Sequence, residues 1–183
     1  MKFRTEFIYR KLTQYFGLLL LFVSANLHGQ EGSHSSKNHT ISAGIGHIQV
    51  AKGIKDGNKT WVSLPSWALD YHYSLSENWS ISLQNEIVQS DFEVEDASDE
   101  VITRSSPYSA IVAIGYKPLE VLTIFTGVGG EFAREENFGV VRFGIEPSWE
   151  IGERFELLLC ANYDVKIEAY DSFGINLGVG YKF

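Results

Sequence analysis

The sequence lacks a pair of cysteines, a long apolar run and a helical periodicity, and each absence excludes one way of stabilising a fold. Its one cysteine, Cys160, excludes an internal disulfide. Its longest apolar stretch, from Gly17 to Leu27, falls short of the roughly 20 residues that a membrane-spanning helix needs. No helical periodicity is present after residue 40. The chain must therefore be stabilised without disulfides and without helices.

The first 29 residues predict a secretory signal peptide. Basic residues precede the apolar stretch, which is typical of an export signal. We expect cleavage near Gly29–Gln30, with an uncleaved anchor as the alternative. The whole chain carries a net charge of −8, and removing a leader of net charge +3 leaves −11. Such a charge argues against binding nucleic acid and against electrostatic docking on anionic lipid.

The rest of the chain alternates apolar and polar residues in segment after segment, which predicts β-strands. The first segment begins at Thr40, and its alternation slips near Gly46–His47, where we expect a bulge. Counting this segment and the last one, the sequence predicts eight strands, at residues 40–50, 67–75, 79–87, 108–116, 122–132, 141–149, 155–163 and 173–183.

The connections between these strands alternate strictly between short and long. Tight turns follow Leu75, Tyr116 and Ile151, whereas longer polar links are expected at residues 51–66, 90–107, 133–137 and 165–172. If the strands run up and down, most of their aromatic residues fall near one of the two ends. Two aromatic belts with aliphatic residues between them are typical of a barrel that spans a membrane.

The polar face of the strands decides which side is inside. A soluble, lipocalin-like barrel would also show eight alternating strands, with its apolar face turned inward. Here the polar face is rich in glycine and serine and suits the narrow interior of an eight-stranded barrel. We therefore predict an all-β fold, an eight-stranded antiparallel transmembrane up-and-down β-barrel over residues 40–183, preceded by a short periplasmic tail at residues 30–39.

The end of the chain, "LGVGYKF", explains why the pattern continues to the last residue. In a closed barrel the last strand pairs with the first, because unpaired backbone groups are costly in hydrocarbon. This ending and the eight strands resemble the small outer-membrane barrels of Gram-negative bacteria, namely the OmpX-like and OmpW-like proteins and the membrane domain of OmpA. The resemblance implies a monomer in outer-membrane lipid and a signal for the barrel-assembly machinery in Leu177, Val179, Tyr181 and Phe183.

Two groups of charged residues are candidate functional sites. Arg142 faces several lumenal acids, and we expect a plug-like network with Glu86, Glu146 and Glu156; a narrow charged conduit is the alternative. The second group is a run of acids without a base, which predicts a solvated loop. Its alternative is a surface loop that binds divalent cations or a basic partner, through Asp91, Glu93, Glu95, Asp96, Asp99 and Glu100.

Catalysis and cofactor binding find little support in the sequence. His72 and Ser74, near Asp70, would suit a lipid A-modifying enzyme, but their predicted direction is into the lumen and away from lipid. His34 and His39 lie in the expected tail and lack metal-ligand spacing. We expect no enzyme and no cofactor, but a structural or surface-interaction role through the extracellular loops. The OmpW-like resemblance implies the alternative, a narrow channel for small solutes.

Overall fold

The computed structural model describes residues 38–55, 58–95 and 100–183. These residues form ten strands. The predicted signal peptide, residues 1–29, lies outside the described residues, as does most of the predicted tail. Among the described residues, no helix is long and apolar enough to cross a membrane.

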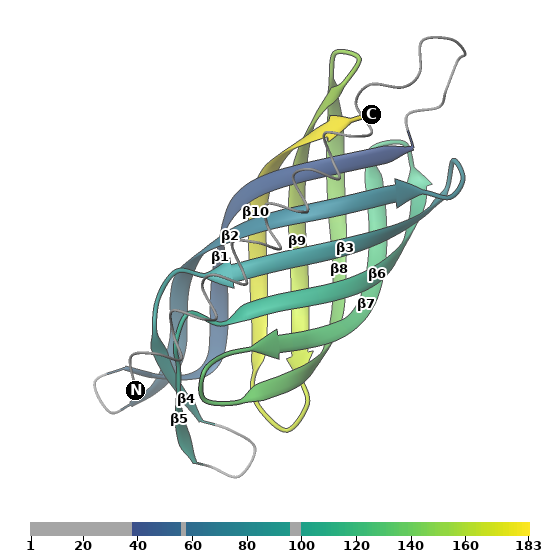
Figure 1. Ribbon diagram of the computed structural model, residues 1–183. Helices are drawn as coiled ribbons and strands as arrows, with labels where there is room; N and C mark the ends of the chain where they lie inside the picture. The colour runs from purple at the N-terminus through teal and green to yellow at the C-terminus, as the bar shows by residue number, and fades with distance from the viewer. Residues whose placement is uncertain (1–37, 56–57, 96–99) are drawn as a thin grey trace, which may run out of the picture. The chain divides into compact units, whose positions relative to one another are not determined.

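Eight of the strands form a closed antiparallel barrel, as predicted (Figure 1). Each strand pairs with the next around the ring, and the last pairs with the first from Thr40↔Lys182 to Val50↔Ser172. The barrel strands are β1 (His39–Lys55), β2 (Asn58–Ser74), β3 (Trp79–Val88), β6 (Tyr108–Leu119), β7 (Leu122–Phe132), β8 (Asn137–Ile151), β9 (Phe155–Lys166) and β10 (Asp171–Lys182).

The end of the chain is held at the β1–β10 closure. The backbone N–H of Phe183 donates to the carbonyl of His39 at 2.9 Å, and the rings of these two residues stack with centroids 5.6 Å apart. His39 is the first residue of β1 and its Nδ1 lies 2.6 Å from the Tyr71 hydroxyl. The expectation that His39 belongs to a solvated tail is therefore wrong.

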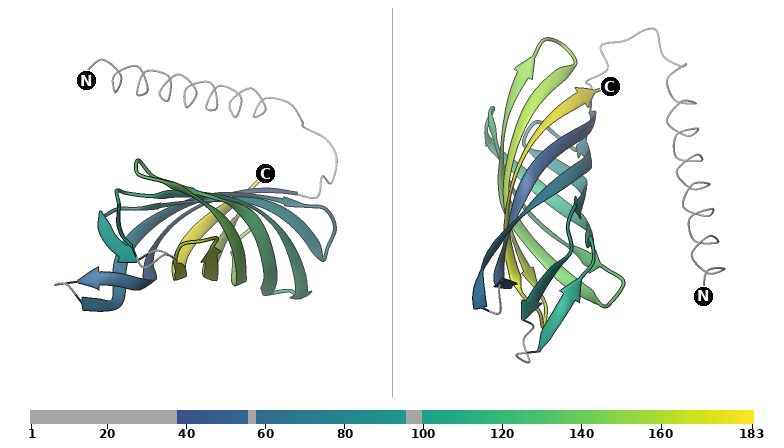
Figure 2. Two further views of the ribbon diagram at one scale, coloured as in Figure 1. Left: turned by 90° about the horizontal axis from the view of Figure 1, so that it is seen from below. Right: turned by 90° about the vertical axis from the view of Figure 1, so that its left-hand side faces the viewer.

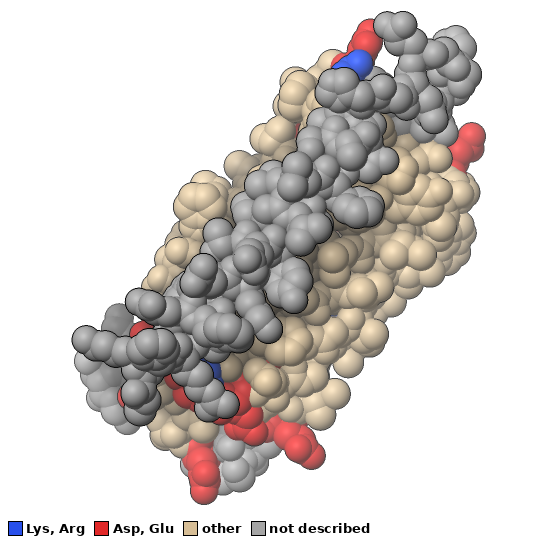
Figure 3. Space-filling view, viewed as in Figure 1, with Lys and Arg blue, Asp and Glu red and all other residues tan. Residues whose placement is uncertain are grey.

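The outer surface of the barrel is apolar, as the alternation predicted. Along β6 and β10, Val112, Ile114, Leu177 and Val179 are exposed, whereas Ile111 and Ala113 are buried inside. In Figure 3, the part of the barrel flank that is not covered by grey atoms is largely free of charged residues, which gather toward the two ends. In lipid this surface is favourable, and in water it would be an extensive apolar patch.

Aromatic rings border this apolar band at both ends. At the short-turn end, Trp79 packs on Tyr116 and Phe155 packs on Tyr181, with centroids 5.0 and 5.4 Å apart. At the long-loop end, Tyr108 stacks on Phe132. Amphipathic rings prefer the interface between lipid and water, so the belts mark the two membrane surfaces.

Inside the barrel, large side chains lie over small neighbours. The ring of Phe125 lies so close to its cross-strand partner Gly144 that a Cβ there would overlap it. Asn176 lies over Gly46 in the same way, across the β1–β10 pair. Phe125 and Leu158 are both buried, which fits an interior that holds side chains and little else. The inward glycines are therefore required by packing.

A short hairpin adds to the barrel at the long-loop end. Its strands are β4 (Phe92–Glu95) and β5 (Val101–Arg104), and β4 pairs with the far end of β1 through Gly53↔Val94 and Ile54↔Glu93. Figures 1 and 2 show the hairpin at the end opposite the C-terminus. The expectation that residues 90–107 are only a polar link is wrong, because Phe92 and Val94 of β4 are apolar and buried.

The first strand also differs from its prediction, because part of its inner face contacts the hairpin. Its pairing with β2 and β10 is unbroken from Thr40 to Val50, so the expected bulge near Gly46–His47 is absent. The register shift occurs later, between Val50 and Gly53. The apolar–polar alternation changes phase in the sequence because Ile48 and Val50 are apolar although they face inward, where they contact the hairpin.

Candidate functional site

A buried ion network crosses the middle of the lumen, centred on Arg142 of β8. Its Nε and Nη2 atoms donate to the two carboxylate oxygens of Asp164 at 2.7 and 2.8 Å. Nη2 also lies 3.2 Å from Glu86 Oε2, and Nη1 donates to Gln84 Oε1 at 3.3 Å. Such a bidentate ion pair fixes both the position and the plane of the Arg142 guanidinium.

Neutral side chains extend this network around the wall. Asn162 donates to Asp164 at 3.2 Å, and Asn176 donates to Glu86 at 3.1 Å. Ser66 of β2 donates to Asn176 at 3.3 Å. Side chains from β2, β3, β8, β9 and β10 are thus joined across the interior, which leaves little room for a continuous water path at this level.

The other two acids proposed for this network lie elsewhere. Glu146 Oε1 lies 3.9 Å from His72 Nδ1, and Glu156 Oε2 lies 3.1 Å from Lys182 Nζ. Lys182 also bonds Glu150 at 2.7 Å, close to the short-turn end. Asp164 was the missed partner of Arg142. Direct pairing of these two residues in the β8–β9 ladder follows from the register, which the alternation alone does not give.

A second buried ion network lies at the long-loop end and centres on Glu131. Arg104 Nη2 lies 2.6 Å from Glu131 Oε1, and Lys166 Nζ lies 3.5 Å from Oε2. The Tyr170 hydroxyl donates to Glu131 at 2.6 Å. Burial, reinforced by this carboxylate, raises the pKa of Tyr170 well above its ordinary value, so the hydroxyl stays a donor.

Arg104 reaches this network from the hairpin and is fully buried. Its Nη1 donates to the backbone carbonyl of Glu136 at 2.7 Å, and its guanidinium lies 4.6 Å from the centroid of the Phe138 ring. The sequence does not single out Arg104, because the acidic run beside it predicts a solvated link over residues 90–107. The alternation of Phe92 with Val94 and of Ile102 with Arg104 was the available signal.

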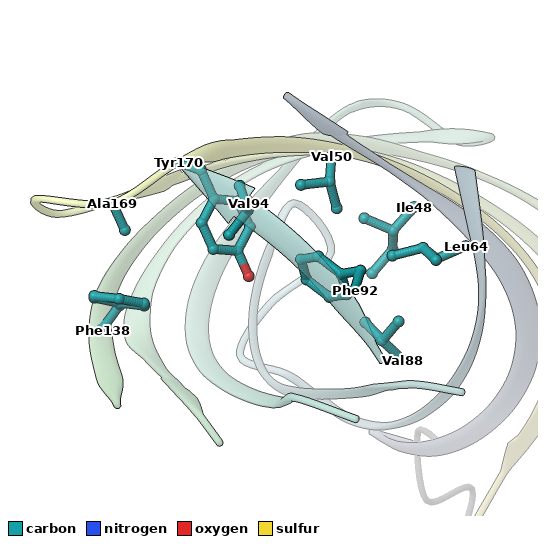
Figure 4. Close-up of a cluster of buried hydrophobic side chains, with 9 residues drawn as sticks. All are labelled: Ile48, Val50, Leu64, Val88, Phe92, Val94, Phe138, Ala169 and Tyr170. Carbon is teal, nitrogen blue, oxygen red and sulfur yellow. The ribbon is translucent and has the colours of Figure 1, made fainter. Parts of the chain in front are cut away.

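Apolar side chains close the barrel mouth beside Arg104. In Figure 4, β4 crosses the opening, and Phe92 points toward Ile48, Leu64 and Val88 of the barrel wall. The rings of Phe92 and Tyr170 meet edge to face, with centroids 5.9 Å apart. Val94 is completely buried in the same cluster. The hairpin therefore fills the mouth of the barrel from above.

The acidic segment that was proposed as a surface loop is divided by this arrangement. Asp91, Glu93 and Glu100 are exposed, whereas Glu95 is buried. Asp96 and Asp99 lie outside the described residues. The Ser106 hydroxyl lies 3.5 Å from Asp91 Oδ1, at the base of the hairpin.

Acidic residues dominate the outside of this end. Where side chains are described, the exposed bases are Lys52 and Arg134, against a larger set of exposed acids, namely Asp91, Glu93, Glu100, Glu135, Glu136 and Glu168. Figure 3 shows carboxylates gathered around this end. Hydrogen bonds from the side chain and backbone of Ser105 lower the pKa of Glu135, so it is ionised at neutral pH.

The remaining candidate residues lie on the outer barrel wall and in the lumen near the short-turn end. Leu177 and Val179 face outward on β10, and Phe183, the residue after β10, is also exposed. Tyr181 packs between Phe155 and Phe183. His72 Nε2 has no hydrogen-bond partner among the described residues, and its Nδ1 faces Glu146. Within the described ranges, no group of three or more His, Cys, Asp or Glu side chains could hold a metal ion.

Comparison with known proteins supports the fold. No family model matches the chain, and no curated protein matches it. One similar solved structure is Ail, the attachment invasion locus protein of Yersinia pestis, in complex with the heparin analogue sucrose octasulfate, at 18% identity and TM-score 0.54 over 80% of this chain and 98% of that chain. OprG of Pseudomonas aeruginosa is 13% identical with a TM-score of 0.53, and the match covers 80% of this chain and 95% of that chain. Neisserial surface protein A is 10% identical with a TM-score of 0.52, and the match covers 79% of this chain and 97% of that chain.

At these identities the likeness establishes the fold. All three structures are small barrels, and the apolar, aromatic-bordered outer surface of this chain fits the same setting. The predicted fold class is therefore confirmed: the chain forms a closed eight-stranded antiparallel β-barrel of the kind that outer-membrane proteins adopt.

Proposed function

We propose that this protein acts at the cell surface through its extracellular end, as an interaction protein and not as a channel or an enzyme. The observation that carries the proposal is the hairpin in the barrel mouth, which separates an acidic outer surface from the lumen. Below it, the Arg142 network forms a second obstruction. Two buried obstructions in so narrow a barrel argue against the solute-channel alternative.

The charge of the extracellular end favours a basic partner. Among the side chains that the structure describes, exposed acids there outnumber exposed bases, and the hydrogen-bonded Glu135 keeps its charge at neutral pH. Like charges repel, so a sulfated ligand such as the one bound to Ail is disfavoured here. A cationic protein segment or polycation would instead be attracted, with a strength that falls as salt rises.

A binding measurement tests this proposal. The protein is placed in nanodiscs of zwitterionic lipid, and its binding to fluorescent polylysine and to fluorescent heparin is compared, with empty nanodiscs as the control. We expect salt-sensitive binding of polylysine and none of heparin. The matched variant Glu93→Gln/Glu135→Gln/Glu136→Gln should bind polylysine more weakly. Preference for heparin, or no binding of polylysine, would refute the proposed partner class.

A further inference from the structure

The groups at the barrel mouth that contact the hairpin, which we call the recess, offer two chemical environments side by side. One part is apolar and is lined by Ile48, Leu64, Val88 and Phe138 of the barrel wall. The other part offers the Glu131 carboxylate, the Glu136 carbonyl and the face of the Phe138 ring. An acid, a carbonyl and an aromatic face are what a guanidinium or an alkyl ammonium group requires.

The chain fills this recess with its own side chains. Phe92 and Val94 occupy the apolar part, and Arg104 occupies the polar part with all of its surface buried. The Nε atom of Arg104 has no hydrogen-bond partner among the described residues. A buried donor without a partner costs free energy, so the fit of Arg104 is incomplete. The hairpin thus resembles a bound ligand whose polar contacts are not all satisfied.

The backbone of the hairpin is joined to the barrel at few positions, so the hairpin is held mainly by its buried side chains Phe92, Val94 and Arg104. It pairs with β1 at two positions only, and β5 is the terminal strand of the sheet. Such a short addition to a sheet is a low-stability element compared with the continuously paired barrel. The recess and the hairpin therefore differ in backbone pairing: Ile48, Leu64, Val88, Glu131 and Phe138 belong to continuously paired barrel strands, whereas the hairpin pairs with the barrel only through β1.

Backbone strain is concentrated around the same place. Three described residues other than glycine have positive φ angles, and each lies within two residues of the hairpin or of a residue that contacts it. Lys52, at φ 59°, lies in the β1 bulge beside the paired residue Gly53. Ser106, at φ 44°, is the second residue after β5, and Glu168, at φ 60°, lies in the turn that precedes Tyr170. Strain of this kind persists where surrounding structure enforces it, and it gathers at sites of binding and switching.

From these observations we propose that the recess is a binding site for a ligand carrying an apolar group beside a cation, and that the β4–β5 hairpin is its displaceable occupant. A basic, amphipathic peptide segment is the class that fits, because its side chains would replace Phe92, Val94 and Arg104 group for group. The inference rests on the proposed function, since the acidic rim attracts the same class of partner.

The test uses two peptides of equal charge and a hairpin that can be locked. The probes are fluorescent hexapeptide amides, one alternating Phe and Arg and the other alternating Ser and Arg. The protein is the variant Ile54→Cys/Glu93→Cys/Cys160→Ser in zwitterionic nanodiscs. Residues 54 and 93 are direct partners between β1 and β4, on the side of the hairpin away from the recess. Oxidation joins the hairpin to β1, and reduction frees it in the same molecule.

We expect the Phe–Arg peptide to bind the reduced protein and to bind the oxidised protein about tenfold more weakly, a loss of roughly 1.4 kcal/mol. The Ser–Arg peptide should bind both forms equally and weakly, through the rim alone. Glu131→Gln should weaken Phe–Arg binding without changing Ser–Arg binding. Equal binding of the Phe–Arg peptide to both redox forms would overturn the recess while leaving the surface role intact. No binding of either peptide would overturn both proposals.

Discussion

Arg142 and Asp164 are direct neighbours across the β8–β9 ladder and form a two-pronged ion pair inside the barrel. Both side chains are almost completely buried. Each charge therefore depends on the other, because a single unpaired charge in the poorly solvated interior is energetically unfavourable. Glu86 lies against the same guanidinium and shares this dependence.

Removing Arg142 should destabilise the barrel strongly. We expect Arg142→Ala to lower the free energy of unfolding by about 3–5 kcal/mol, because it leaves Asp164 and Glu86 buried without a cation. Urea unfolding in lipid vesicles, followed by tryptophan fluorescence, measures the change. The double variant Arg142→Ala/Asp164→Ala should be less destabilised than the two single changes added together. Simple additivity would mean that the two side chains do not interact.

The two faces of the strands should respond differently to substitution. Replacing the outward residue Val112 or Leu159 with Arg should cost about 2–4 kcal/mol of folding free energy if the site lies near the bilayer midplane. The matched change on the inner face, Ser82→Asn, keeps a neutral polar group among polar neighbours and should cost much less. Folding titrations in vesicles compare the three. Equal costs on both faces would contradict the assignment of lipid and lumen.

The last residues should control assembly more than stability. Phe183 closes the seam with His39 and ends a strand whose outward residues resemble the recognition end of outer-membrane barrels. Deleting Phe183 should reduce the amount of protein inserted in the outer membrane and leave precursor in the periplasm. Cell fractionation with a heat-modifiability gel measures both. Leu122→Ala, an apolar change away from the seam, serves as the control, and normal insertion without Phe183 would count against this role.

Glu135 provides a test of the folded surface at the long-loop end. Its pKa is lowered in the folded protein, so its contribution to stability is present above its ordinary pKa and is lost as pH falls through the lowered value. We expect Ser105→Ala to return the pKa of Glu135 toward its ordinary value, because both Ser105 groups contact this carboxylate and the hydroxyl is removed. A carboxyl-carbon NMR titration reports the change; Ser63→Ala is the control.

The sequence predicted the barrel well because its two environments differ sharply. Each lipid-facing residue contrasts with a polar or small lumenal neighbour, and this contrast marks strand after strand. The prediction failed where the contrast disappears. Ile48 and Val50 face inward but are apolar, since the hairpin covers them. Their position in the alternation led to the wrong prediction of a bulge.

The candidate site was harder to predict than the fold. Arg142 and Glu86 were found because a lumenal charge must be paired, but the choice of Asp164 depends on strand register. Arg104 could not be placed in the mouth from its loop position alone. Its burial results from a contact between residues far apart in the sequence, with Glu131 as the partner.

Single-channel conductance in a planar bilayer tests most directly whether the lumen is closed at two levels. Four proteins are compared: the wild type, Arg142→Ala, a variant in which a short Gly–Ser linker replaces residues 91–105, and the combination of both changes. Each single variant keeps one obstruction, so we predict no steady current from the wild type or either single variant, and cation current from the combination alone. Large, steady currents from the wild-type protein would contradict a closed barrel.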